Sequence, residues 1–161
     1  VAEALDLLGE QASNFEFVHQ TGEDDLERMR GAYERAGVEG EVLPFLYDMA
    51  ERYRWAHMAV ARSGAMTVGE VAAMGLPALL IPLPTATHGH QEMNARQLAE
   101  AGAARMILQS DLSGASLAKS LLEMNADRSQ LAEMSRRAQH TITSNGAGKV
   151  NELCRKTAQA A

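Results

Sequence analysis

The sequence predicts an α/β fold built on a doubly wound, parallel sheet. Short apolar stretches alternate with segments of helical periodicity along most of the chain. The stretch Ala78–Ile81 is apolar without interruption, as expected of a strand that is covered on both faces. Strands that are regularly separated by helices favour right-handed crossovers, and such crossovers produce parallel neighbours.

The first elements follow from periodicity and end signals. Val1–Ala12 predicts a helix because its apolar side chains recur at helical spacing. Phe15–His19 contains two phenylalanines and a valine and predicts a short strand. Glu23–Ala36 returns to helical spacing, and Gly37 follows it as a C-cap. Glu41–Pro44 predicts the second strand.

The middle of the chain alternates in the same way. Asp48–Trp55 suits a short helix with an aspartate near its start, and His57–Ala61 is a candidate strand. Thr67–Met74 predicts a helix that a glycine and a proline end. The apolar strand Ala78–Ile81 follows directly.

The last part of the chain is mainly helical. His90–Ala101 predicts a helix ended by a glycine, and Arg105–Leu108 predicts a last strand. Three more helices are expected, at Ala115–Met124, Arg128–Gln139 and Gly146–Ala158.

Composition and charge exclude several classes of protein. The 161 residues are 46% apolar, enough for one domain with a substantial core. The net charge of −6 argues against a nucleic-acid binder and gives no general attraction to an anionic membrane. Cys154 is the only cysteine, so the sequence has no internal disulfide and no cysteine-based metal site. We find no secretory signal, and the longest apolar run is too short to span a bilayer.

The chain begins within a helical pattern, whereas a doubly wound sheet normally begins with its central strand. We therefore expect residues 1–161 to form a single domain that is truncated at its N-terminus and lacks its first strand. The two neighbouring strands would then expose unpaired edges, which favours association between copies. Light scattering behind size-exclusion chromatography would test for such association.

Ligands of open α/β sheets bind at the carboxyl ends of the strands, and the first segment expected there is Arg62–Ala65. Gly64 removes a side chain where a ligand must approach the backbone. The helix start that follows offers unpaired N–H groups to a phosphate. Glu70, about one turn further on, could accept two hydrogen bonds from a ribose diol. The alternative is a plain strand–turn–helix corner in which Glu70 only moderates the helix dipole.

The second segment is Pro82–Gln91, which follows the most apolar strand. His88, His90, Gln91 and Asn94 crowd this loop and the next helix start, and amide side chains suit the recognition of hydroxyl groups. A metal site needs three or four convergent ligands, and no acidic cluster lies nearby. A catalytic histidine would lack a paired carboxylate in the local sequence. The alternative is a polar, exposed loop.

The third segment is Phe45–Asp48, between a strand and a short helix. An apolar ledge with free backbone groups could hold a flat base there. The alternative is that Phe45 belongs to the core, where phenylalanine is usually found. His19, His57 and His140 are isolated in the sequence and are assigned no role.

Taken in order, these residues resemble one known family. The motifs are LPFLYDMA (43–50), WA (55–56), RSGAMTVGE (62–70), GLPA (75–78), HQEMNA (90–95) and AGAA (101–104). The series closely resembles the C-terminal half of the MurG family, the bacterial N-acetylglucosaminyltransferases that make lipid II. The likeness runs from about Val1 to about Ala160, and the ordered combination RSGA-x-T-x-x-E, G-x-P and HQ-x-x-N is highly specific.

The resemblance implies a GT-B glycosyltransferase, in which two Rossmann-like domains face each other and the C-terminal one binds UDP-GlcNAc. It implies that backbone near Leu46 meets the uracil, that the helix start at Met66–Thr67 lies by the diphosphate and sugar, and that Glu70 takes the ribose hydroxyls. Gln91 and Asn94 would hold the GlcNAc hydroxyls, and His90 lies where members of the family vary. The expected substrate-binding residues are Leu46, Ser63, Gly64, Ala65, Met66, Thr67, Glu70, His90, Gln91 and Asn94.

The resemblance also implies a reaction and its partners. GlcNAc would pass from UDP-GlcNAc to the 4-hydroxyl of lipid I with inversion, and helix N-termini would stabilise the leaving UDP without a cofactor or a metal. The family's Gly-Gly-Ser-rich loop, its general-base histidine and its membrane-contacting patch are not found in these 161 residues. We therefore expect no catalytic residue here, no turnover from this chain alone, a soluble fragment, and a whole enzyme placed peripherally on the cytoplasmic side of the bacterial inner membrane.

Two other functions stay open. A transferase of another UDP-sugar to a lipid, such as one using UDP-galactose, would keep the fold, and competition between donors would separate the two. A non-catalytic UDP-sugar-binding subunit of a split transferase is the second alternative. The sequence encoded upstream of Val1 would distinguish such a subunit from part of a longer enzyme.

Overall fold

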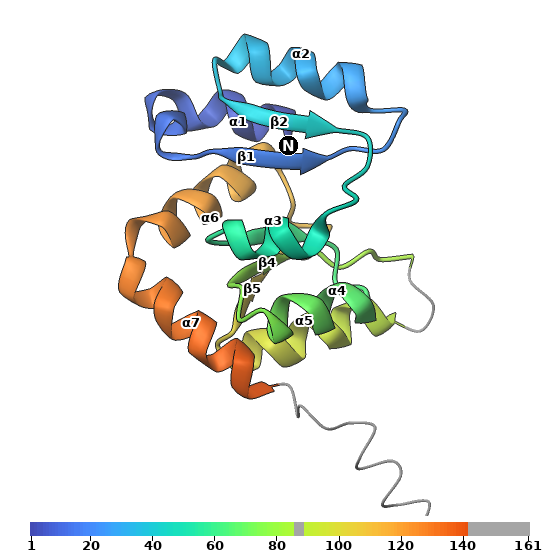
Figure 1. Cartoon of the computed structure of the whole chain (residues 1–161), viewed down its shortest axis with the longest axis vertical. Coiled ribbons are helices and arrows are strands. Elements are labelled where there is room, and N and C mark those ends of the chain that lie inside the picture. The colour runs from blue at the N-terminus through green and yellow to red at the C-terminus, as the bar shows by residue number, and fades with distance from the viewer. Residues whose placement is uncertain (86–88, 142–161) are drawn as a thin grey trace, which may run out of the picture.

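The computed structural model describes residues 1–85 and 89–141, and it is an α/β structure (Figure 1). The strands are β1 (Phe17–Gln20), β2 (Gly40–Leu43), β3 (Ala59–Ala61), β4 (Ala78–Leu80) and β5 (Ala104–Met106). The helices are α1 (Ala2–Leu8), the 3-10 helix η1 (Gly9–Asn14), α2 (Leu26–Ala36), α3 (Met49–Trp55), α4 (Ala65–Ala73), α5 (His90–Glu100), α6 (Gly114–Ala126) and α7 (Arg128–Thr141).

The strands are all parallel, which confirms the predicted α/β class, but they form two sheets. The first sheet has the order β1-β2, and the second has the order β3-β4-β5. Among the described strands, β1 pairs only with β2, and β3 pairs only with β4. In a doubly wound sheet, these two groups are the flanks on either side of the central strand. The sequence analysis predicted parallel strands but not their division into two sheets.

Strand β4 lies at the centre of the second sheet and is covered on both faces. Ala78, Leu79 and Leu80 are each 0% exposed. Leu79 packs in the cluster that contains α1, α2 and α6, whereas Ala78 and Leu80 pack in the cluster of α4 and α5. Successive side chains of a strand point to opposite faces, so one short strand contributes to both cores. The expectation of a doubly covered strand is confirmed.

Helix boundaries differ from the predicted ones by a few residues at their ends. The first helix ends at Leu8 and continues as the 3-10 turn η1, because Gly9 takes a positive φ of 53°. The last residue of α2 is followed by Gly37, whose φ of 62° is the left-handed conformation of the predicted C-cap. The expected helix Gly146–Ala158 lies outside the described residues.

Helices α6 and α7 run along one side of the molecule, from the part that contains the first sheet to the part that contains the second (Figure 1). Helix α6 packs on α1, and α7 packs on α4. Helix α6 begins with a capping box formed by Ser113 and Ser116. Among the helices of the described ranges, none is long and apolar enough to cross a membrane.

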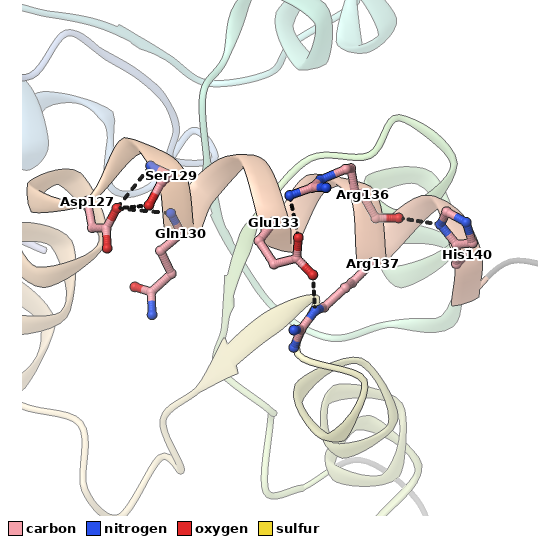
Figure 2. Close-up of polar contacts among 7 residues, drawn as sticks. All are labelled: Asp127, Ser129, Gln130, Glu133, Arg136, Arg137 and His140. Atoms are coloured by element: carbon pink, nitrogen blue, oxygen red, sulfur yellow. Dashed lines mark hydrogen bonds and ion pairs between the residues drawn. The ribbon is translucent and has the colours of Figure 1, made fainter.

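Polar contacts between residues close in sequence occur at the start of α7 and along its length (Figure 2). At its start, the Asp127 carboxylate accepts the Ser129 hydroxyl at 2.6 Å and the Gln130 N–H at 3.0 Å. The hydroxyl of Ser129 is the main cause that lowers the pKa of Asp127, and backbone N–H groups add to it. Glu133 pairs with Arg136 at 2.5 Å and with Arg137 at 2.7 Å on the exposed face of the helix. These arginines lie on a solvated face, as ion pairs of this kind usually do.

The burial of His19 makes the stability of the protein depend on pH. Its ring is partly buried and its Nδ1 lies 3.4 Å from the Tyr33 hydroxyl. Burial, aided by the positive N-terminus and opposed by Asp25, lowers the pKa of His19 below its ordinary value of 6.5. The folded state therefore disfavours the protonated ring, and stability that is complete above pH 6.5 is lost as the pH falls through the folded pKa.

We predict that the unfolding midpoint in urea falls between pH 7 and pH 5 and that His19→Gln flattens this dependence. The control is His57→Gln, whose ring is exposed and which should keep the parent slope. A slope unchanged by His19→Gln would contradict the assignment.

Candidate functional site

The corner between β3 and α4 has the geometry of an anion-binding site. Helix α4 begins at Ala65, two residues before the predicted start, and its N-cap Gly64 makes no side-chain cap hydrogen bond. The first intrahelical bond runs from the Val68 N–H to the Gly64 carbonyl at 2.9 Å. The preceding N–H groups are thus left for another acceptor, and the helix dipole adds partial positive charge there. A Cβ on Gly64 would meet nothing within 4 Å, so its absence serves access rather than packing.

Ser63 ties this corner to the next helix. Its side chain is completely buried, and its hydroxyl donates to the Gln91 carbonyl at 2.8 Å. The Ser63 carbonyl in turn accepts a hydrogen bond from the Asn94 side-chain amide at 3.1 Å. Both bonds connect the start of α4 with the first turn of α5. Ser63 and Asn94, expected at the substrate, therefore brace the scaffold in this structure.

Gln91 has a similar bracing contact. Its Oε1 accepts the Leu83 N–H at 2.9 Å, which orients the segment that leaves β4. The Gln91 Nε2 donors are not used by this bond. His90 is exposed at the first position of α5, after Gly89 with a φ of 66°. His88 lies outside the described residues.

Glu70 and Tyr53 meet at the side of the corner. Glu70 is an exposed residue of α4, and the Tyr53 hydroxyl of α3 donates to its Oε2 at 3.2 Å. Burial, with the Glu70 charge and this hydrogen bond as further causes, raises the pKa of Tyr53 to about 12. The phenol is therefore protonated, and a donor to Glu70, throughout the neutral range.

The segment Phe45–Asp48 forms an exposed apolar ledge, as one of the two predictions for it expected. Leu46 is the buried residue, whereas Phe45 is 53% exposed. The alternative that places Phe45 in the core is wrong, because the chain turns Leu46 inward and leaves its neighbours outside. Phe45 instead packs edge-on against the exposed Tyr47 ring, with centroids 4.8 Å apart. The pair presents an apolar surface at the carboxyl end of β2.

Gln20 is a residue of this ledge that the motifs did not identify. Its Oε1 accepts the Leu46 N–H at 3.0 Å, so this backbone donor already has a side-chain partner. Gln20 is the last residue of β1, and the rule that ligands gather at the carboxyl ends of parallel strands could have found it. A base at this ledge would use the Leu46 carbonyl or displace the Gln20 amide.

Arg62 is the basic residue of the corner. Its guanidinium donates to the Ile81 carbonyl at 3.2 Å and to the Gln109 side chain at 2.7 Å. These bonds connect the ends of β3 and β4 with the loop after β5. Among the residues that the structure describes, no cluster of three His, Cys, Asp or Glu side chains could hold a metal ion.

A cavity of about 460 Å³ lies elsewhere, between α3 and the amino ends of β1 and β2. Its lining carries more acidic than basic side chains: Glu16, Glu39, Glu41, Asp48 and Glu51 against Arg52, which pairs with Glu41 and Asp48. Such a lining would repel a diphosphate. The corner between β3 and α4, with its helix dipole and Arg62, is better suited to bind an anion.

Parallel strands with polar loops gathered at their carboxyl ends define a Rossmann-like, ligand-binding α/β domain. Residues 1–156 match the glycosyltransferase family 28 C-terminal domain, and the chain belongs to this family. The resemblance to MurG proteins noted in the motifs is thereby confirmed.

Curated relatives carry the same name across several bacteria. A UDP-N-acetylglucosamine--N-acetylmuramyl-(pentapeptide) pyrophosphoryl-undecaprenol N-acetylglucosamine transferase from Halorhodospira halophila is 45% identical over 98% of this chain and 44% of its own length. The enzyme of that name from Thiobacillus denitrificans is 43% identical over 99% of this chain and 43% of its own. The chain thus spans less than half the length of these relatives.

Solved structures agree on the fold. The crystal structure of Acinetobacter baumannii MurG superposes with a TM-score of 0.81 at 32% identity, over 96% of this chain and 48% of that one. A glycosyltransferase of kitacinnamycin superposes with a TM-score of 0.62 at 18% identity, over 96% of this chain and 37% of that one, and supports the fold alone. The predicted fold, the C-terminal half of a GT-B glycosyltransferase, is confirmed.

The buried Ser63 hydroxyl yields a stability prediction. Ser63→Ala removes the donor to the Gln91 carbonyl and should lower the free energy of unfolding by about 1–3 kcal/mol, the usual cost of an unpaired buried polar group. Urea denaturation measures the change. Ser110→Ala, at an exposed serine, is the control and should shift stability by less than about 0.5 kcal/mol. Equal effects of the two substitutions would contradict the bracing role.

Proposed function

We propose that this chain forms the UDP-GlcNAc-binding part of an inverting N-acetylglucosaminyltransferase that converts lipid I into lipid II in peptidoglycan synthesis. Family membership and the names of the relatives support the donor and the lipid acceptor. The observation that carries the proposal is the α4 start without a side-chain cap, with Glu70 on the same helix. One element thus offers N–H groups to a diphosphate and a carboxylate to a ribose.

The donor would lie along the carboxyl ends of the strands. Its diphosphate would meet the N–H groups at the corner formed by Gly64, Ala65, Met66 and Thr67, where the helix dipole favours negative charge. The ribose would lie at Glu70, and the base on the ledge at Leu46. The sugar would lie toward the first turn of α5, where His90, Gln91 and Asn94 gather.

The scaffold contacts limit how α5 can recognise the sugar. The Asn94 amide nitrogen already donates to Ser63, and Gln91 Oε1 already accepts from Leu83. The remaining groups are the Asn94 carbonyl oxygen and the Gln91 amide nitrogen. The Asn94 oxygen is an acceptor and the Gln91 amide nitrogen carries N–H donors, so together they offer both kinds of partner that a sugar hydroxyl requires.

The chemical step breaks the bond between the anomeric carbon and the diphosphate oxygen while the acceptor's 4-hydroxyl forms a new bond to that carbon. Negative charge then develops on the leaving UDP, and preorganised N–H groups at the α4 start would stabilise it. The hydroxyl proton passes to a general base, for which we propose no residue of this chain.

We further propose that residues 1–161 form one donor-binding domain and that the acceptor and the membrane are contacted through another part of the protein. The enzyme would then act peripherally at the cytoplasmic face of the inner membrane. The net charge of −6 fits this division, because an acidic surface is not attracted to anionic lipid.

Calorimetric titration with UDP and UDP-GlcNAc tests the donor site. We expect binding by the parent chain and a loss of about tenfold or more with Glu70→Ala, since two charge-assisted hydrogen bonds to the ribose are removed. Glu100→Ala, at an exposed glutamate at the opposite end of α5, should bind like the parent. Equal affinity of the Glu70→Ala and parent chains would refute the site, and a preference for UDP-galactose would refute the donor.

Turnover is the second test. Because we assign no general base to these residues, the 161-residue chain should not transfer GlcNAc from UDP-GlcNAc to a lipid I analogue. Product formation, followed as radiolabelled lipid, would contradict this division of roles.

A further inference from the structure

Tyr53 joins the two helices that flank the proposed nucleoside position. It belongs to α3, which follows the ledge Phe45–Asp48, and its hydroxyl donates to the Glu70 carboxylate of α4 at 3.2 Å. None of the motifs quoted above assigns Tyr53 a role. The contact crosses 17 residues of sequence, so only the fold brings the two side chains together.

Both the Tyr53 side chain and the helix that carries it are fixed by contacts. Its side chain packs against the cluster that contains β4, α4 and α5. The start of its helix is tied to β2, because Arg52 donates to Asp48 at 2.9 Å and forms an ion pair with Glu41. The hydroxyl is therefore presented from a fixed ring rather than from a mobile side chain.

Glu70 is exposed and has three side-chain torsions, so without a partner it would sample several rotamers. A carboxylate has about four acceptor positions, and Tyr53 occupies one of them. The remaining positions are sufficient for both hydroxyls of a ribose. The contact therefore restrains the carboxylate without consuming the acceptors that a diol requires.

We propose that Tyr53 is a positioning residue that holds the Glu70 carboxylate in the rotamer that receives the ribose 2′- and 3′-hydroxyls of the nucleotide. The inference rests on the proposed function and extends it to a residue that does not touch the ligand. Helix α3 directly follows the ledge Phe45–Asp48. It would therefore help to position both the base on that ledge and the Glu70 carboxylate that accepts the ribose hydroxyls.

The protonation state of the phenol agrees with this role. Burial raises the pKa of Tyr53 to about 12, with the neighbouring Glu70 charge and the hydrogen bond as smaller causes. The hydroxyl thus stays a donor at every pH at which the nucleotide would be bound.

The test compares the binding of UDP with that of 2′,3′-dideoxy-UDP by calorimetry in the parent chain and its variants. Tyr53→Phe should raise the Kd for UDP about three- to tenfold, because binding must then also order the Glu70 side chain. The same substitution should leave the Kd for dideoxy-UDP unchanged. In a Glu70→Ala background, Tyr53→Phe should cause no additional loss.

Tyr33→Phe is the matched control, since its hydroxyl faces the His19 ring in the other cluster, and it should leave both affinities unchanged. Equal weakening of UDP and dideoxy-UDP by Tyr53→Phe would reduce Tyr53 to a packing residue and overturn the inference. So would unchanged UDP binding by Tyr53→Phe while Glu70→Ala weakens it, an outcome that leaves the donor site intact. If Glu70→Ala itself has no effect on UDP, the proposed function fails along with the inference.

Discussion

Complete burial of β4 is the constraint on which the rest of the structure depends. Leu79 and Leu80 are 0% exposed and point to opposite faces, so each anchors a different hydrophobic cluster. Strands β3 and β5 pair with β4 in parallel on either side. Their carboxyl ends consequently meet at one edge, and the loops after all three strands are brought together there. The corner between β3 and α4 is a consequence of this apolar strand.

A network of hydrogen bonds then holds that edge in place. Ser63 connects to Gln91 and Asn94, and Arg62 connects to Ile81 and Gln109. Within the described ranges, no buried side-chain nitrogen or oxygen lacks a partner. Satisfied polar networks of this kind make a region rigid, because any displacement leaves buried groups unpaired. Rigidity at a helix start matters for the proposed reaction, since fixed N–H groups stabilise developing charge without reorganising.

Local and overall charge have opposite signs in this protein. The chain carries a net charge of −6, and the cavity beside α3 is lined by acidic side chains. The corner combines the positive end of the α4 dipole with Arg62. Exposed charges more than about 10 Å apart are largely screened at moderate ionic strength, so only acidic side chains near the corner would oppose the proposed binding of a diphosphate there. The excess of acidic side chains in that cavity disfavours an anion at the amino ends of β1 and β2.

Local patterns in the sequence were sufficient to predict the α/β class, the order of the described strands and helices, the doubly covered β4 and the left-handed cap at Gly37. Periodicity, apolar runs and turn chemistry depend on neighbouring residues, so they can be read without the fold. The ordered motifs also sufficed for the family. The tertiary structure alone divided the strands into two sheets and exposed Phe45. It also engaged the Leu46 N–H with Gln20 and placed Tyr53 on Glu70. Each of these depends on contacts between residues far apart in sequence, and no local pattern encodes which distant partners will meet.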